Sequence, residues 1–244
     1  GPYSTSFPVR QWLSPNVMPA INRMPQVADA IITYVGELAD AKYIAMVDAS
    51  LNGNNPCVNA AVAGAAADTL HSGAVTASGK AATIPQATGK LLDATKTFTI
   101  CYAETSGSDT DTSWRDSYVR VRISKIHTFS AHSVTHKTYG SLAKTPALEI
   151  TYAGSLAASK WVSMVDATLN SNFPCASGSV AAQAAGALNS PPNSPSSGVD
   201  QADGSKVVTF DTTKMHSSTV FAVCYAETGG TQTDSWVDTG LRLT

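Results

Sequence analysis

The sequence predicts a mainly β fold: two tandem homologous β-sandwich-like domains, each with a short Ala-rich helix, preceded by an extended N-terminal arm. Three observations predict it: an internal repeat, strand-like segments separated by turn residues, and five prolines in the first 26 residues. Short strands that recur about every ten residues are typical of β-sandwiches.

The arm comes first and spans residues 1–26. Its prolines oppose a long helix or a central strand, because proline lacks a backbone N–H and has a fixed φ. We expect so apolar a segment to pack onto its own domain or onto a neighbouring chain. The candidate assembly residues of the arm are Tyr3, Phe7, Trp12, Leu13, Val17 and Met18.

The internal repeat defines the two domains. Residues 33–52 and 151–170 are identical at twelve of twenty positions, at a constant offset of 118. The block Cys-Tyr-Ala-Glu-Thr at 101–105 returns at 224–228. The predicted organisation is an arm at 1–26, a first β domain at 27–126, a linker at 127–144 and a second β domain at 145–244.

Matching secondary-structure signals follow in both domains. Residues 97–102 alternate polar and apolar side chains, as a half-buried strand does, and 220–225 are their counterpart. Residues 56–70 are Ala-rich and begin with proline, which favours the first position of a helix. We therefore expect a short helix or helical turn there and in the matching residues 174–188.

Composition narrows the function. Only 14% of the residues are charged, against roughly 25% in an ordinary soluble domain, and the net charge is −2. The chain has no basic tract for nucleic acid, and no apolar run approaches the roughly 20 residues of a membrane helix. A surface with little charge opposes contact between copies only weakly, which favours assembly.

The four cysteines form matched pairs, Cys57 with Cys101 and Cys175 with Cys224. An even count in matched pairs suggests one disulfide in each domain. The alternative is four buried thiols in a reducing compartment, where cysteine behaves as a small apolar residue.

Repeated acidic and aromatic residues invite two functional interpretations. Glu104 and Glu227 could be compared with the carboxylate pair of a glycoside hydrolase, but the duplication places each in a separate domain, so we expect structural roles at strand ends. Trp114 and Trp236 lie beside turns, where a Trp either stacks on sugar rings or closes the end of a sandwich. We expect the second role.

Two groups of residues are compared with metal sites. Asp109, Asp111 and Asp116, with Asp234 and Asp238 in the second domain, form a loose acidic cluster that is far from a twelve-residue calcium loop. We expect structural roles for Asp116 and Asp238.

Three histidines, His127, His132 and His136, fall in the predicted linker. Their spacings of five and four fit neither one helical face nor one strand face, so a solvated linker is preferred over a zinc site. No Gly-x-Ser-x-Gly elbow occurs either. We predict no metal, no cofactor and no enzymatic activity.

The tandem domains, with the Cys-Tyr-Ala-Glu-Thr block followed by Trp114-x-Asp116 and again by Trp236-x-Asp238, resemble the pyrenoid shell (PyShell) family of diatoms and haptophyte algae. The resemblance covers both domains and carries over no functional residue beyond these blocks. It implies a protein of the chloroplast stroma, at the pyrenoid periphery, that self-assembles into a sheet or tube around Rubisco and supports CO2 concentration and fixation. A stromal location would favour free thiols.

The expected function is thus structural, with the chain itself as the main partner, Rubisco or other pyrenoid proteins as further candidates, and no nucleic acid or membrane span. The alternative is a secreted cell-surface or cell-wall module that binds glycans.

Overall fold

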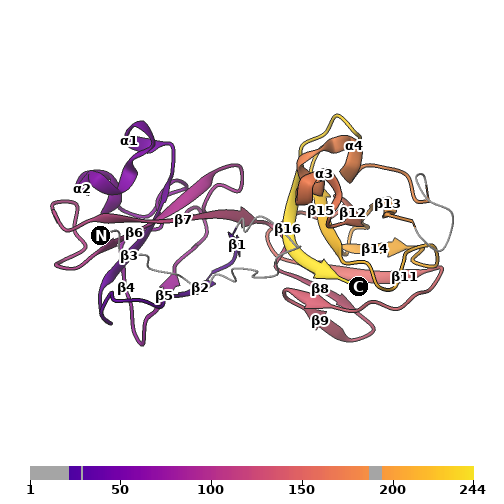
Figure 1. Ribbon diagram of the computed structural model, residues 1–244, viewed down its shortest axis with the longest axis horizontal. Coiled ribbons are helices and arrows are strands. Elements are labelled where there is room, and N and C mark those ends of the chain that lie inside the picture. The colour runs from indigo at the N-terminus through magenta and orange to yellow at the C-terminus, as the bar shows by residue number, and fades with distance from the viewer. Residues whose placement is uncertain (1–21, 29, 187–193) are drawn as a thin grey trace. The chain divides into compact units, whose positions relative to one another are not determined.

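The computed structural model describes residues 22–28, 30–186 and 194–244, and every structural statement below concerns these residues. The protein is mainly β, as predicted, and divides into two compact units whose boundary lies between Ile123 and Ser124 (Figure 1). The six candidate assembly residues of the arm lie outside the described residues. Each unit is considered by itself.

Unit 1 contains a five-stranded sheet in the order β1-β7-β6-β3-β4 and a two-stranded sheet, β2-β5. The strands of the larger sheet are β1 (Asn22–Pro25), β7 (Arg115–Ser124), β6 (Thr97–Ala103), β3 (Tyr43–Asp48) and β4 (Val75–Thr76). Those of the smaller sheet are β2 (Ala30–Thr33) and β5 (Ala81–Ile84).

Unit 2 repeats this plan with a larger second sheet. Its five-stranded sheet has the order β10-β16-β15-β12-β13, and its four-stranded sheet the order β14-β11-β8-β9 (Figure 1). The first sheet comprises β10 (Tyr139–Gly140), β16 (Trp236–Leu243), β15 (Phe221–Ala226), β12 (Trp161–Asp166) and β13 (Ser196–Gln201). The second comprises β14 (Val207–Phe210), β11 (Leu148–Ala153), β8 (Thr128–Ala131) and β9 (Val134–His136).

The segment 127–144 differs from the predicted solvated linker. It contains β8, β9 and β10, all of which belong to the sheets of unit 2. Phe129 on β8 pairs with Tyr152 on β11 and is fully buried in the core. The segment has no obvious sequence counterpart in the other repeat. For this reason the comparison of the repeats did not assign it to the second domain.

The expected Ala-rich helices are short helical turns. In unit 1 they are α1 (Leu51–Asn54), η1 (Pro56–Val58) and α2 (Ala60–Ala63), and in unit 2 they are α3 (Leu169–Asn172), η2 (Pro174–Ala176) and α4 (Gly178–Ala181). A longer helix does not form because Asn59 has an extended backbone, from which its side chain accepts a hydrogen bond from the Ala61 N–H.

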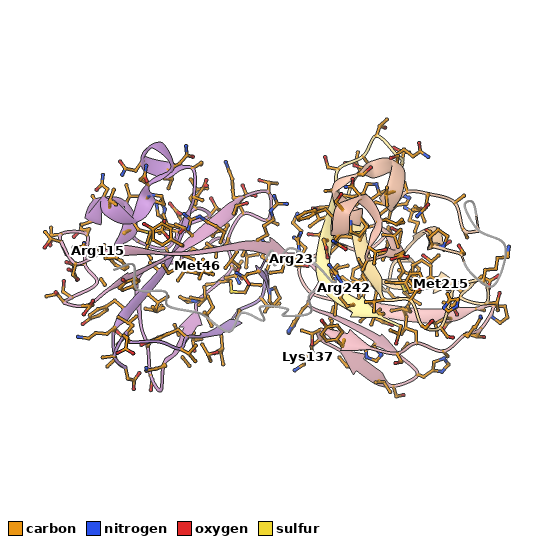
Figure 2. All side chains as sticks on the ribbon, viewed as in Figure 1. Arg23, Met46, Arg115, Lys137, Met215 and Arg242 are labelled. Atoms are coloured by element: carbon orange, nitrogen blue, oxygen red, sulfur yellow. A yellow bond between two sulfur atoms is a disulfide. The ribbon has the colours of Figure 1, made fainter. Side chains whose placement is uncertain are left out.

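Each unit buries both faces of its five-stranded sheet. On β3, Ile44 and Met46 enter the core between the two sheets, while Ala45 and Val47 face a second cluster that includes residues of the helical turns (Figure 2 labels Met46). This explains why β3 reads as a continuous apolar run rather than an alternating one. The second cluster contains the cysteines and the tryptophan of the repeat signature.

Candidate assembly surface

The structure shows that the four cysteines form disulfides, one in each unit, which the sequence had left open. Cys57 is bonded to Cys101 and Cys175 to Cys224, with Cα–Cα distances of 5.3 and 5.5 Å. Each bridge ties the 3₁₀ turn to the central sheet and is buried. All four cysteines are therefore structural, and the free-thiol alternative is wrong for this structure.

Both signature tryptophans pack against these disulfides. The Trp114 side chain is 2% exposed and the Trp236 side chain 9%. Their Nε1–H groups donate to the carbonyl oxygens of Ser108, at 2.8 Å, and Thr231, at 3.0 Å. Rings buried in this way cannot stack on a sugar. They belong to the second cluster of each unit, together with the disulfide and residues of the helical turns.

Asp116 and Asp238 form ion pairs along their own strands. The Asp116–Arg120 pair measures 2.7 Å and the Asp238–Arg242 pair 2.8 Å. Burial acts to raise the pKa of Asp116, but hydrogen bonds led by that from Arg120 outweigh it and hold the pKa below its usual value. Arg242 (labelled in Figure 2) is more buried than Arg120, at 5% against 38% side-chain exposure.

Asp111 and Asp234 hold the turn that precedes each Trp. Asp111 accepts hydrogen bonds from the backbone N–H groups of Ser106 and Gly107, at 2.6 and 2.7 Å. A side-chain hydrogen bond from Ser113 is the largest influence on the Asp111 carboxyl, whose pKa lies well below its usual range. Asp234 holds the second unit's turn in the same way.

These carboxylates are therefore engaged by the chain itself, and Asp109 stands exposed on the same turn. Among the described residues, no cluster of three or more His, Cys, Asp or Glu side chains is arranged to hold a metal ion.

The remaining candidate residues differ in exposure and in the contacts that they make. Glu104 is exposed after β6, while Glu227 accepts a 2.6 Å ion-pair contact from Lys125. His132 sits exposed on the β8–β9 turn, His136 is buried on β9, and burial lowers the pKa of His127. These contacts give each residue a local structural setting.

A pocket of about 230 Å³ opens in unit 2, lined by apolar side chains that include Met164, Met215 and Phe221, with Lys144 and His216 also on its wall. Sites for drug-sized ligands usually enclose about 300–1,000 Å³. The pocket is smaller than that range, and it offers no pair of catalytic carboxylates.

Unit 1 exposes large apolar side chains where unit 2 does not. Ile31 is 65% exposed, Val35 50%, Val58 71% and Tyr118 77%. The residues at the matching positions of unit 2 are Glu149, Ala153, Ala176 and Gly240. Every one of them is smaller or charged, although unit 2 exposes the apolar side chains of Val134 and Tyr139 at other positions. We call Ile31, Val35, Val58 and Tyr118 the four exposed apolar positions.

Tyr118 is the most unusual of the four. It occupies a β-bulge between β6 and β7 with φ of 63°, whereas its counterpart Gly240 has φ of 83°. A left-handed backbone costs roughly 1–2 kcal/mol for a residue other than glycine. The ring is exposed, while the backbone N–H of Tyr118 donates to Asp116 Oδ1 at 2.6 Å and so holds the bulge. The Gly240 N–H donates to Asp238 in the same way, at 2.8 Å, so the bulge belongs to both units and the exposed tyrosine ring to unit 1 alone.

Sequence reasoning missed the four exposed apolar positions, although comparing the two repeats position by position would have found them. The described residues also expose Val134 and Tyr139, on β9 and β10.

No helix within the described residues has the length and apolar character needed to cross a membrane.

Comparison with known proteins adds little. No protein-family model matches the chain, and no curated protein matches it. Among solved structures, it is similar to a chimeric titin Z1Z2 functionalized with a KLER exogenous peptide from decorin, at 9% identity, over 100% of this chain and 98% of the other. The TM-score of 0.22 is too low for this likeness to carry an argument.

Proposed function

We propose that this chain is a structural protein that assembles with copies of itself into a sheet or tube. The observation that carries the proposal is the set of four exposed apolar positions, which unit 1 displays and unit 2 replaces with smaller or charged residues. Covering these side chains with a neighbouring copy would remove apolar area from water and so would stabilise an assembly.

The duplication supports an open assembly rather than a closed pair. Two homologous units that differ at their exposed positions give the chain non-identical faces. Contacts between non-identical faces are heterologous, and they propagate into rings or open lattices. The low fraction of charged residues, 14%, weakens the repulsion between neighbouring copies.

The specific setting proposed first is the shell around the Rubisco-containing pyrenoid of an algal chloroplast, where the assembly would support CO2 concentration and fixation. This setting rests on the sequence resemblance alone.

A second setting, a secreted cell-surface or cell-wall module, is favoured by one observation. Both disulfides are closed, and disulfides persist mainly in oxidising compartments. In that setting, glycan binding would have to use residues other than the two buried tryptophans.

Light scattering tests the assembly. The purified chain is expected to form particles far larger than its mass of 25.3 kDa, over a range of concentration and salt. The matched variant gives unit 1 the residues of unit 2: Ile31→Glu, Val35→Ala, Val58→Ala and Tyr118→Gly. It should remain folded, by circular dichroism, and assemble less. A wild-type chain that stays monomeric under all these conditions would refute the proposal.

The setting is tested in the source cells by trapping thiols with an alkylating reagent at the moment of lysis and by locating the tagged protein. A tagged protein that surrounds Rubisco supports the pyrenoid setting. Full oxidation together with a signal at the cell surface supports the second setting and refutes the first.

A further inference from the structure

The pocket of unit 2 can be compared with the same place in unit 1, because hydrogen bonds around it recur. The Thr212 hydroxyl lies within hydrogen-bond distance of the carbonyl oxygens of both residues that flank Lys144, at 2.8 and 3.1 Å. In unit 1, the Gln86 amide donates to the carbonyl oxygens of both residues that flank Gln26, at 2.9 and 3.1 Å. Lys144 therefore takes the place of Gln26, and Thr212 that of Gln86.

A second pair of matching turns lies on the other wall of the pocket. Nδ1 of His216 accepts a hydrogen bond from the Ser218 N–H at 3.1 Å. In unit 1, the Asp93 carboxylate accepts one from the Thr95 N–H at 2.8 Å. His216 therefore takes the place of Asp93.

The pocket is open because unit 2 has less chain at this place. In unit 1, Leu92 follows Gln86 by six residues, is fully buried in the core, and accepts a 2.6 Å hydrogen bond from Gln26. In unit 2, Met215 (labelled in Figure 2) follows Thr212 by only three residues, and both line the pocket. The shorter connection accounts for the volume of about 230 Å³.

The floor of the pocket suits a short apolar group. Met164, Met215 and Phe221 line it, and none of these side chains is more than 7% exposed. An apolar cavity of about 150 Å³ holds benzene, so a cavity of this size holds roughly nine non-hydrogen atoms by proportion. An apolar chain of about six to eight carbons would therefore fill it.

The wall of the pocket attracts a negative charge. Lys144 is exposed there and forms no ion pair with any described residue. Because Nδ1 of His216 accepts the Ser218 N–H, the neutral ring carries its proton on Nε2 and has that donor left for a ligand. The lining residues include no carboxylate side chain. Unit 1 has an amide and a carboxylate at the two matching positions, so both differences favour an anion in unit 2.

We propose that this pocket binds a medium-chain monocarboxylate, with its apolar chain on Met164, Met215 and Phe221 and its carboxylate beside Lys144 and His216. Charge-assisted hydrogen bonds to the carboxylate would fix the orientation of the ligand. The site lies within unit 2 and does not depend on the proposed function.

Octanoate is the probe, and methionine carrying a carbon-13 methyl group reports where it binds. The spectra are recorded in solution, or with magic-angle spinning if the chain forms large particles. The signals of Met164 and Met215 should shift as octanoate is added, whereas those of Met24 and Met46 in unit 1 should not. The expected dissociation constant is on the order of 1 mM or tighter.

Equilibrium dialysis of matched variants tests the recognition of charge. Lys144→Gln and His216→Asp introduce the residues of unit 1, and each should weaken octanoate binding about fivefold or more. The control Lys214→Gln changes the net charge as Lys144→Gln does, at a residue that does not line the pocket, and should bind as the wild type does. Octan-1-ol, which has the same number of carbons and no charge, should bind about fivefold more weakly than octanoate. Circular dichroism checks that each variant is folded.

Three results would overturn the inference. The first is no uptake of octanoate at about 10 mM, ten times the expected dissociation constant. The second is a shift of the Met46 signal equal to that of Met164, which would indicate uptake without a site. The third is equal binding by Lys144→Gln and Lys214→Gln, or equal binding of octanoate and octan-1-ol. Assembly is measured separately by particle size, so a monomeric chain that binds octanoate would refute the proposed function alone.

Discussion

Removing the disulfide of unit 1 should cost a large part of the roughly 5–15 kcal/mol by which folded domains are stable. The bridge joins Cys57 and Cys101, which are 44 residues apart. The chain-entropy relation for a closed loop of this length gives about 4 kcal/mol at 25 °C. Replacing both cysteines with alanine avoids a buried hydroxyl and leaves the rest of the cluster around Trp114 in place.

Urea unfolding is the assay, followed by circular dichroism and by tryptophan fluorescence. The variant Cys57→Ala with Cys101→Ala should lose about 4 kcal/mol of unfolding free energy in unit 1. The matched variant is Cys175→Ala with Cys224→Ala, whose bridge spans 49 residues and should cost nearly the same in unit 2. A loss below about 1 kcal/mol in both variants would refute the reasoning, since a structural bridge usually contributes about 2–4 kcal/mol. Labelling of four thiols in the unreduced wild-type protein would refute it as well.

Three further predictions follow from local contacts. Asp238→Ala removes the carboxylate that pairs with a buried arginine and should destabilise unit 2 by about 3–5 kcal/mol. Asp116→Ala, whose arginine is 38% exposed, should cost nearer about 1 kcal/mol in urea unfolding of unit 1. The pKa of Asp111 is lower in the folded protein than in the unfolded chain. Its contribution to stability is therefore complete above the unfolded pKa of about 3.9 and is lost as the pH falls toward the folded value. Asp111→Asn should make the melting temperature depend less on pH in the acid range, and an unchanged dependence would count against this. Gly107→Ala would place a Cβ against the Tyr43 ring at a φ of 66°, so it should cost about 1–3 kcal/mol. A variant as stable as the wild type would contradict this.

The sequence was sufficient for the fold class because the repeat is preserved in its details. Paired blocks such as the one beginning at Cys101 and its counterpart at Cys224 lie on equivalent strands, β6 and β15. Alternation along 97–102 indicated a strand, but it did not show that helical turns cover the second face, because that covering comes from chain distant in sequence. The bridging of the cysteines was open for the same reason: pairing depends on distance in space.

The candidate surface was harder to predict. Exposure of Ile31 or Val58 cannot be inferred from an apolar residue in a strand or turn, since most such residues are buried. The comparison of the repeats also did not predict β8. Hairpins tolerate sequence change when a bulky residue such as Phe129 still fills the core. Only the pairing of β8 with β11 revealed that β2 has an uncovered edge within the described residues.

Electron microscopy of the purified full chain tests self-assembly most directly. The account predicts extended sheets or tubes with a regular repeat, which thin out or disappear when the four exposed apolar positions receive the residues of unit 2. Fields of separate particles no larger than a 25.3 kDa protein, at every concentration that the wild-type chain tolerates, would contradict it.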